Sequence, residues 1–371
     1  MSPPRSFLSR LLGAAKVGFG VAALTALLFV FVEGASSILL LTGDLRKAAR
    51  RPPTERIHTR YDPLLGWANI PGIAAQDLYG PSRGLRINSQ GFRDSREFGV
   101  HVPAGKIRIV CLGDSFTLGY GVDDDHTWCH LLAAMDPRIE TVNMGQGGYG
   151  LDQAYLWYAR DGVKLDHDVL IFAFITEDFR RMQRKEFLGY GKPILRIRND
   201  GLEARNVPVP RRSYYFPWLT RNAPLFRKLK TLELLERLLG TASPTGPPPD
   251  LPGDPETWKV ALKIFDTLHA TTRVHGGLLA LVSLSDAADY QVDKSDHWRG
   301  SLRSEAGQKG FVFLDLVDEI RKLPADEVPG LYDYHFNEKG NQWVARALYE
   351  KLTSLPEVQS KLAERGGTPP P

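Results

Sequence analysis

Short apolar runs alternate with amphipathic stretches along the chain from residue 107 onward. Five runs are rich in β-branched or aromatic residues and predict strands, at residues 107–112, 141–143, 169–175, 278–282 and 311–314. Between them, apolar residues recur every three or four positions and predict helices near residues 127–135, 153–161, 257–272 and 339–352. Strands bounded by helices predict an α/β fold, a three-layer α/β/α arrangement around a parallel five-stranded sheet.

The pattern is interrupted between the third and fourth predicted strands. About a hundred residues lie there, far more than a crossover requires, so we expect an insertion over residues 179–254. Residues 179–230 hold 14 Lys or Arg against three acids, a charge of +11 in a chain whose total is +4. This segment is either a solvated basic surface or a site for an anionic partner such as lipid headgroups or an acidic polysaccharide, which Arg180, Arg181 and Arg184 would contact.

The N-terminal segment has no charge from Val17 to Val32 and stays apolar through Leu41. One helix over residues 17–42 would be ~39 Å long, enough to cross a hydrocarbon core of ~30 Å. Glu33 would then lie near the far interface, where its carboxylate reaches water. A cleaved signal peptide is the alternative, because basic residues precede the apolar stretch. Without a convincing small-x-small cleavage site, the sequence favours an uncleaved transmembrane anchor.

Composition narrows the protein class. The chain of 371 residues is 43% hydrophobic and 24% charged, as in globular proteins, and a net charge of +4 does not indicate a nucleic-acid partner. Two cysteines, Cys111 and Cys129, exclude a disulfide scaffold and a Cys-rich zinc module. Outside the cytoplasm these two residues could form a disulfide, or both could stay buried thiols.

Candidate chemistry follows the first and last predicted strands. Gly113-Asp114-Ser115 ends the first strand, which places Ser115 at the carboxyl edge of the sheet, where open α/β folds bind ligands; a plain turn with a helix cap is the alternative. A serine nucleophile needs a base. Of nine histidines, His335 has the best setting, because Asp333 could accept its Nδ1–H and leave Nε2 free for the serine proton; Asp296-His297 is the nearest rival.

Together these motifs resemble the SGNH/GDSL hydrolase family over residues 105–355, apart from the insertion. Gly113-Asp114-Ser115 resembles the family's first block, residues 143–150 its second, and Asp333 with His335 its last. The resemblance implies an SGNH-hydrolase or flavodoxin-like fold with Ser115 as nucleophile, His335 as base and Asp333 as its orienting acid. The N–H groups of Ser115 and Gly145 would form the oxyanion hole. Residues 87–94 resemble a segment that often precedes the hydrolase domain in membrane-anchored bacterial members.

The third block departs from the family pattern, because Glu177 stands where an Asn normally donates to the oxyanion. An ionised carboxylate only accepts hydrogen bonds, and losing one such donor costs ~3–4 kcal/mol. Three explanations are open. Glu177 is held protonated, it points away from the site, or the activity is reduced.

The resemblance implies a membrane-anchored serine ester hydrolase that acts on acyl or acetyl esters of a cell-envelope glycan or lipid, without a metal or cofactor. Residues 1–16 would be cytoplasmic, and the domain would lie on the periplasmic side of a bacterial inner membrane. Residues 43–104 would form a linker and an N-terminal extension, and residues 356–371 a Pro-rich tail. The alternatives are an O-acyltransferase with the same triad, or a noncatalytic binding or assembly protein that retains the fold.

Overall fold

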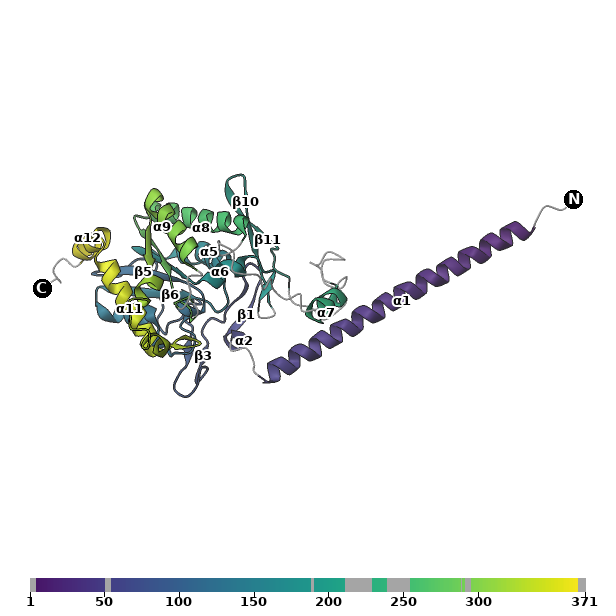
Figure 1. Ribbon diagram of the computed structural model, residues 1–371, viewed down its shortest axis with the longest axis horizontal. Helices are drawn as coiled ribbons and strands as arrows, with labels where there is room; N and C mark the ends of the chain where they lie inside the picture. The colour runs from purple at the N-terminus through teal and green to yellow at the C-terminus, as the bar shows by residue number, and fades with distance from the viewer. Residues whose placement is uncertain are drawn as a thin grey trace. The chain divides into compact units, whose positions relative to one another are not determined.

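The computed structural model describes residues 5–50, 55–187, 190–210, 229–238, 254–287, 289–290 and 295–365 (Figure 1). The chain divides into two compact units. One unit consists of residues 1–52 and 212–245, and the other of residues 53–211 and 246–371. The larger unit contains the predicted α/β domain, and each unit is described by itself.

A parallel five-stranded sheet is the centre of the larger unit, as the sequence predicts. Its strands lie in the order β13-β12-β7-β5-β6. They span β5 Ile107–Gly113, β6 Ile139–Gly145, β7 Val169–Phe174, β12 Leu278–Ser283 and β13 Val312–Asp315. The chain order reverses between β5 and β7, so the crevice at their carboxyl ends is where such a sheet binds ligands.

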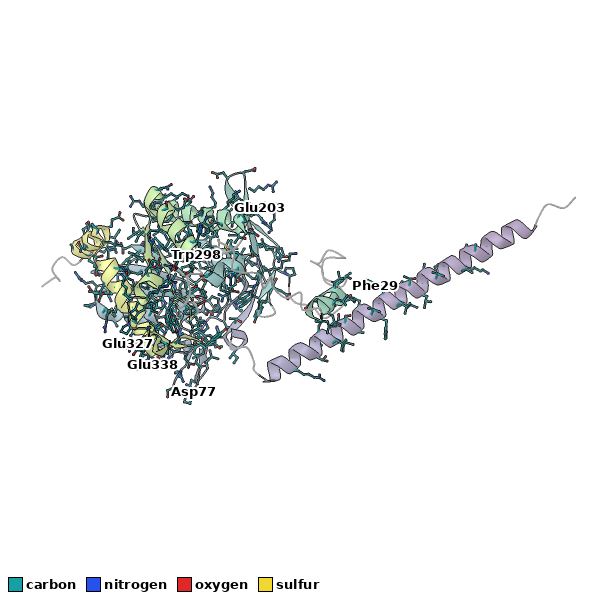
Figure 2. The ribbon with its side chains drawn as sticks, in the orientation of Figure 1. Phe29, Asp77, Glu203, Trp298, Glu327 and Glu338 are labelled. Carbon is teal, nitrogen blue, oxygen red and sulfur yellow. The ribbon has the colours of Figure 1, made fainter. Side chains whose placement is uncertain are left out.

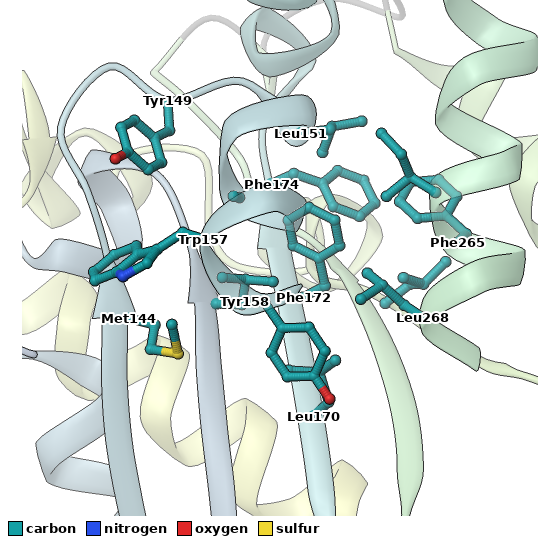
Figure 3. Packing of buried hydrophobic residues seen from close by; sticks show 14 of the residues in the cluster. Met144, Tyr149, Leu151, Trp157, Tyr158, Leu170, Phe172, Phe174, Phe265 and Leu268 are labelled. Atoms are coloured by element: carbon teal, nitrogen blue, oxygen red, sulfur yellow. The ribbon is translucent and has the colours of Figure 1, made fainter. Parts of the chain in front are cut away.

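Helices cover both faces of the sheet and complete three layers (Figure 1). Alternate residues of β5 point to opposite faces, so Val110 and Leu112 pack in one core while Ile109 and Cys111 pack in the other. The first core lies under α5 Leu151–Arg160, α8 Pro255–Val274 and α9 Asp296–Lys309, and includes the aromatic cluster of Figure 3. The second lies under α4 Trp128–Met135, α10 Leu316–Ile320, α11 Glu338–Thr353 and α12 Pro356–Arg365.

Helix α12 corrects the predicted tail. Residues 356–365 are not a tail but a helix that buries Val358 and Leu362, and Arg365 donates to Asp168 at 2.8 Å. The remaining tail residues, 366–371, lie outside the described part of the chain.

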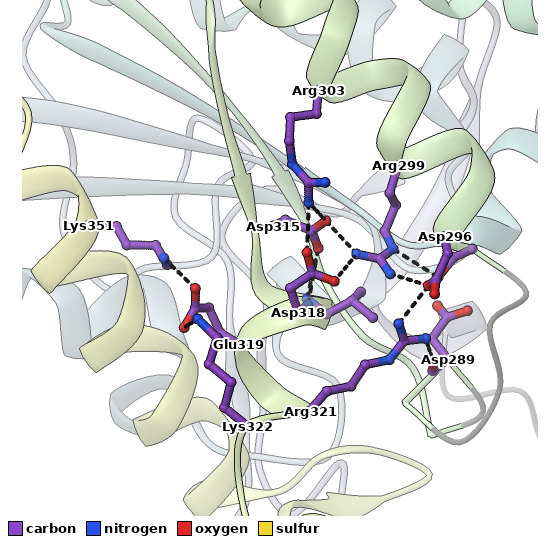
Figure 4. A network of polar contacts seen from close by, with 12 residues as sticks. Asp289, Asp296, Arg299, Arg303, Asp315, Asp318, Glu319, Arg321, Lys322 and Lys351 are labelled. Carbon is purple, nitrogen blue, oxygen red and sulfur yellow. Dashed lines mark hydrogen bonds and ion pairs between the residues drawn. The ribbon is translucent and has the colours of Figure 1, made fainter.

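Helix α9 was not predicted from the sequence, because its buried apolar stripe consists only of Trp298, Leu302 and Ala306 and the rest of the helix is polar, charged or glycine. Its Arg299 is 2% exposed and pairs with Asp296, Asp315 and Asp318 (Figure 4). This network fixes α9 beside the carboxyl end of β13. Asp296 is committed to it and His297 is exposed, so the structure does not support this pair as the rival catalytic base.

The two cysteines are free, buried thiols, Cys111 in β5 and Cys129 in α4. Burial raises the pKa of the Cys111 thiol well above its usual range, and a hydrogen bond from this thiol to Cys129 acts in the same direction. Of the two alternatives left by the sequence, the structure has the thiols.

The N-terminal extension packs on the domain through short hairpins. It comprises α2 Glu55–His58, the pair β1 Thr59–Asp62 and β2 Gly66–Asn69, and the pair β3 Ala74–Ala75 and β4 Leu85–Arg86. Trp67 is fully buried and donates from Nε1 to the carbonyl of Gly147, while the Tyr149 hydroxyl donates to the carbonyl of Trp67. The extension thereby supports the loop that follows β6.

The insertion begins with α6 Thr176–Met182 and continues as two hairpins, β8 Glu186–Phe187 with β9 Tyr190–Gly191 and β10 Ile194–Arg198 with β11 Gly201–Arg205. Lys192, between the hairpins, is 0% exposed; its ammonium contacts Asp152 at 3.2 Å and donates to the carbonyl of Arg181 at 2.8 Å. Lys192, one of the 14 basic residues between positions 179 and 230, is therefore in the interior and not on the surface. Residues 211–228 and 239–253 are outside the described part of the chain.

The smaller unit consists of α1 Arg5–Arg50, a 46-residue helix, and α7 Lys230–Leu238, which packs against it. Among the described residues, one segment is long and apolar enough to cross a membrane, Leu12–Gly43 of α1. Side chains such as Phe29 stand out along this helix, whereas Trp298 is buried in the other unit (Figure 2). Glu33 is 1% exposed, so the expectation that its carboxylate reaches water is wrong, because α7 covers it.

Candidate active site

Ser115 lies where β5 ends and the short helix α3 Ser115–Leu118 begins. Asp114 caps this helix, its Oδ1 accepting from the N–H of Phe116 at 2.8 Å. The helix-cap interpretation of the Gly-Asp-Ser motif therefore holds for Asp114, and the cap fixes the turn that presents Ser115. The Ser115 side chain is almost buried, with 4% of the residue exposed.

His335 is near the C-terminal end of the domain's sequence, 220 residues after Ser115, and contacts Ser115 directly. It lies in β15 His335–Phe336, just before α11, and its Nε2 is 2.8 Å from Ser115 Oγ. The rings of Phe116 and Tyr120 each have their centroid 4.7 Å from that of the imidazole. These aromatic contacts fix the plane of the ring, so that Nε2 is positioned to receive the serine proton.

The structure does not bring the Asp333 carboxylate to the imidazole of His335. Asp333 belongs to β14 Tyr332–Asp333, pairs with His335 through the backbone, and has an exposed side chain. Tyr334, between them, has a φ of 67°, a left-handed conformation that closes this tight turn. The Nδ1 atom of His335 is buried without a hydrogen-bond partner among the residues that the structure describes. The ring is therefore held by packing.

Burial dominates the electrostatics of His335. It lowers the pKa of the imidazole to about 4; the charge of Asp114 acts in the opposite direction and that of Arg181 adds to the lowering. A neutral imidazole is the form that accepts a proton, so His335 is in the basic form over most of the accessible pH range.

The two predicted oxyanion donors differ in whether their N–H groups already have a hydrogen-bond acceptor. The N–H of Ser115 opens a helix, where the first N–H groups have no acceptor within the helix. The N–H of Gly145 donates to Oδ1 of Asn143 at 2.9 Å, and the Asn143 amide also donates to the carbonyl of Thr117 at 2.9 Å. A Cβ on Gly145 would lie 1.9 Å from the backbone nitrogen of Leu118, so only glycine allows this approach to the nucleophile's helix.

Glu177 is not arranged as an oxyanion donor. Its carboxylate accepts from Arg184 Nη2 at 2.7 Å and lies 3.6 Å from Arg180 Nη1. Both arginines are partly exposed, so this trio lies toward the surface. Of the three explanations, the pairing favours a Glu177 side chain that points away from the site, toward its arginines. Arg180 and Arg184 are in turn partly neutralised as contacts for an anionic partner.

Arg181 is an interior residue and not part of the basic surface. It is 8% exposed and its Nη1 donates to Asp114 Oδ2 at 3.0 Å and to Asp178 Oδ1 at 2.6 Å. Asp114 Oδ2 is also 3.3 Å from Ser115 Oγ, so the guanidinium neutralises a carboxylate that touches the nucleophile. Burial and the nearby Asp114 raise the pKa of Asp178 well above its usual range.

Arg93 supports the nucleophile from the N-terminal extension, a role that the sequence did not reveal. The Arg93 side chain is 1% exposed. Its guanidinium donates to the Asp124 carboxylate and to four backbone carbonyls, those of Gly84, Leu118, Gly119 and Val122. The sequence showed that residues 87–94 resemble a family segment, but no local pattern shows which loop an arginine will bridge.

A pocket of about 280 Å³ adjoins the His335 side of the site. Two aromatic residues form part of the pocket wall. Tyr120 packs beside the His335 imidazole, and Phe336 follows His335 in the chain. The exposed Asp333, together with Arg83, Asn337 and Lys339, makes the rest of the lining polar. This mixture of an aromatic ring with charged and amide groups is suited to a polar molecule.

A serine bonded to a histidine at the carboxyl edge of a parallel sheet is the arrangement of a serine acylhydrolase. The model of the GDSL-like lipase/acylhydrolase family matches residues 111–343, which include both Ser115 and His335. The chain therefore belongs to this family.

Solved structures are similar to this chain at low identity. A lipolytic protein of the G-D-S-L family from Veillonella parvula is 15% identical, with a TM-score of 0.38, and covers 67% of this chain and 99% of its own. A putative one from Desulfitobacterium hafniense is 14% identical (TM-score 0.37, 66% and 99% covered). The acetyl xylan esterase AlAXEase is 14% identical (TM-score 0.39, 66% and 100%). No curated protein matches the chain.

Proposed function

We propose that this protein is a membrane-anchored serine ester hydrolase of the SGNH type that acts on acyl or acetyl esters of a cell-envelope glycan or lipid. The observation that carries the proposal is the 2.8 Å contact between His335 Nε2 and Ser115 Oγ at the carboxyl edge of the sheet. A binding protein would have no need of a buried, neutral histidine against a buried serine.

The reaction proceeds in two halves. Ser115 Oγ attacks the ester carbonyl while His335 Nε2 takes its proton, and the Ser115 N–H donates to the oxygen that becomes negative. The Gly145 N–H joins this donor when the Asn143 side chain, which accepts from it at 2.9 Å in the structure, moves aside for the oxyanion. His335 then gives the proton to the departing alcohol. In the second half, His335 activates water, which releases the acid and restores Ser115.

O-acyl transfer is the second candidate, and the pocket beside His335 favours it. An acceptor glycan would be held there by groups such as Arg83 and Lys339, next to the segment that carries His335, and would bring one hydroxyl to the base in the place of water. The acyl group would then pass from Ser115 to that hydroxyl, with His335 again taking the proton. A glycan is the acceptor class that suits a polar pocket with an aromatic wall.

We place residues 17–42 across the membrane, as the anchor, with the hydrolase domain outside the cytoplasm. Support comes from the single long apolar segment of α1 among the described residues and from the resemblance of residues 87–94 to a segment of membrane-anchored members. On this side of a bacterial inner membrane, envelope glycans and lipids are within reach.

The test is reaction of the full chain, in detergent, with a fluorophosphonate probe. We expect the probe to modify Ser115, the label to disappear in Ser115→Ala, and the label to persist in Ser304→Ala, which removes an exposed hydroxyl on α9. Circular dichroism confirms that each variant is folded. A folded but unlabelled protein would refute the hydrolase and transferase proposals and leave the binding role.

If labelling succeeds, incubation with an acetylated polysaccharide, with and without a free glycan acceptor, separates the two enzymatic alternatives. Release of acetate alone indicates hydrolysis, and acetate on the added acceptor indicates transfer.

A further inference from the structure

Burial along α1 changes sharply at Glu33. From residue 12 to residue 32 every position is exposed except the half-buried Val30. From Glu33 onward one face is covered: Glu33, Ser36, Ser37 and Leu40 are each at most 5% exposed. These positions follow i, i+3, i+4, i+7 spacing and form a single stripe. Counted from Val17, where the uncharged stretch begins, Glu33 lies ~24 Å along the helix, near the far side of a hydrocarbon core of ~30 Å.

Helix α7 covers this stripe, and the Glu33 carboxylate caps the N-terminus of α7. The Glu33 carboxylate accepts from the N–H of Lys230, from the N–H of Thr231 at 3.1 Å and from the Thr231 hydroxyl at 2.9 Å. Ser36 Oγ lies 3.2 Å from the same hydroxyl. A carboxylate at the N-terminus of a helix satisfies its unpaired N–H groups and its dipole, which offsets the cost of burying the acid. The carboxylate is thus matched to α7.

The opposite side of α7 is apolar and open. Leu232, Leu235 and Leu238 are 51%, 45% and 73% exposed, and their three-residue spacing places them on one side of the helix. Exposed leucines grouped in this way mark a surface that contacts something apolar. On the side of α1 that α7 leaves uncovered, Ile38 and Leu39 are 62% and 57% exposed, so this side of α1 and the leucines of α7 are both apolar and open.

We propose that α7 is an interfacial helix, docked on α1 at the membrane exit through Glu33, with its three leucines in the boundary between headgroups and acyl chains. The inference rests on the proposed membrane anchoring and not on the proposed catalysis. It also makes α1 a retained anchor, because removal of α1 as a signal peptide would leave α7 without its cap and without its packing partner.

The experiment measures the depth of a fluorescent NBD label in the full chain reconstituted in phosphatidylcholine vesicles. A cysteine at Leu235 carries the label; a cysteine at Leu24, in mid-α1, is the bilayer control, and one at Val274, 82% exposed on α8, is the aqueous control. The native Cys111 and Cys129 are buried and should not react, which the unsubstituted protein checks. The quenchers are lipids with a shallow or a deep doxyl group, and iodide on both sides of the membrane.

We expect the Leu235 label to be quenched by the shallow doxyl lipid and to be at least threefold less sensitive to iodide than the Val274 label. Iodide sensitivity equal to that at Val274 would overturn the interfacial placement while leaving the anchor intact. Protection from both lipid and iodide would also overturn it, in favour of a protein partner or a second copy. Absence of lipid quenching at Leu24 would instead refute the anchor itself.

A second variant tests the docking. Glu33→Leu removes the cap but keeps α1 apolar, so it should raise iodide quenching at Leu235 at least threefold with no change at Leu24. The matched control, Glu233→Gln, removes a carboxylate from α7 itself and should change neither label. An unchanged Leu235 label in Glu33→Leu would overturn the role of Glu33.

Discussion

The pH dependence of ester cleavage tests whether packing alone holds His335. Burial lowers the pKa of this imidazole to about 4, against 6.5 for an ordinary histidine. At 1.36 kcal/mol per pKa unit, the folded site resists protonation by about 3 kcal/mol. At pH 5 about 90% of a group with a pKa of 4 is neutral, compared with about 3% of a group with a pKa of 6.5.

We therefore expect kcat/KM of the full chain for a small acetate ester to stay near its pH 8 value at pH 5 and to halve near pH 4. The assay measures released acetate, so that the readout does not depend on pH, and Ser115→Ala gives the background. Because the folded pKa is below the unfolded one, stability from this group is complete above pH 6.5 and is lost as the pH falls toward 4. Circular dichroism at each pH separates loss of base from loss of fold.

The matching variant is Asp333→Asn. Since the Asp333 side chain is exposed and His335 Nδ1 has no partner among the described residues, kcat should change less than about threefold. In triads where the acid holds the imidazole, the same change costs about 10⁴-fold. An acid limb between pH 6 and 7, together with a loss of that size in Asp333→Asn, would refute the two-residue site and restore the triad.

Four other substitutions test the surrounding structure. Glu177→Asn should change kcat by less than about threefold, because the side chain at this position is directed to Arg180 and Arg184 and not to the oxyanion; a rise of about 10²-fold would show that an amide at position 177 reaches the oxyanion. Lys192→Met leaves Asp152 buried without its partner and should cost about 3–5 kcal/mol in urea unfolding, most of it recovered when Asp152→Leu is added; equal loss in the double variant would contradict this. Arg93→Ala should lower both Tm and kcat, because five contacts around the loop after α3 are lost, and a melting curve like that of the parent would argue against the bridge. Gly145→Ala should abolish probe labelling of Ser115, and a folded, labelled variant would contradict the close backbone approach.

The sheet was predictable because its strands are buried on both faces. Such strands are continuous apolar runs, and β5, β7 and β12 are buried along their whole length. Helix α9 escaped prediction because its apolar stripe is only Trp298, Leu302 and Ala306, and its other contacts join Arg299 to acids up to 19 residues away. Helix α12 was obscured by its proline-rich surroundings.

The site was predictable where chemistry follows a strand. Ser115 and His335 were found from their positions in the strand order, and the structure brings them together. The pairing of Glu177 with Arg180 and of Asp178 with Arg181 was within reach of the sequence, because both have i, i+3 spacing on a helix. The contact between Lys192 and Asp152 was not, since it joins an insertion to a helix 40 residues earlier.

The nucleophile and its base are 220 residues apart in the chain. During synthesis, Ser115 emerges long before His335, and the histidine reaches it only when α11 docks on α4, where Asn341 Oδ1 accepts from the N–H of Trp128. A growing or truncated chain thus carries a chemically inert serine. If Ser115 and His335 act as proposed, ester hydrolysis requires these last secondary-structure elements, and a chain that lacks α11 should not attack esters.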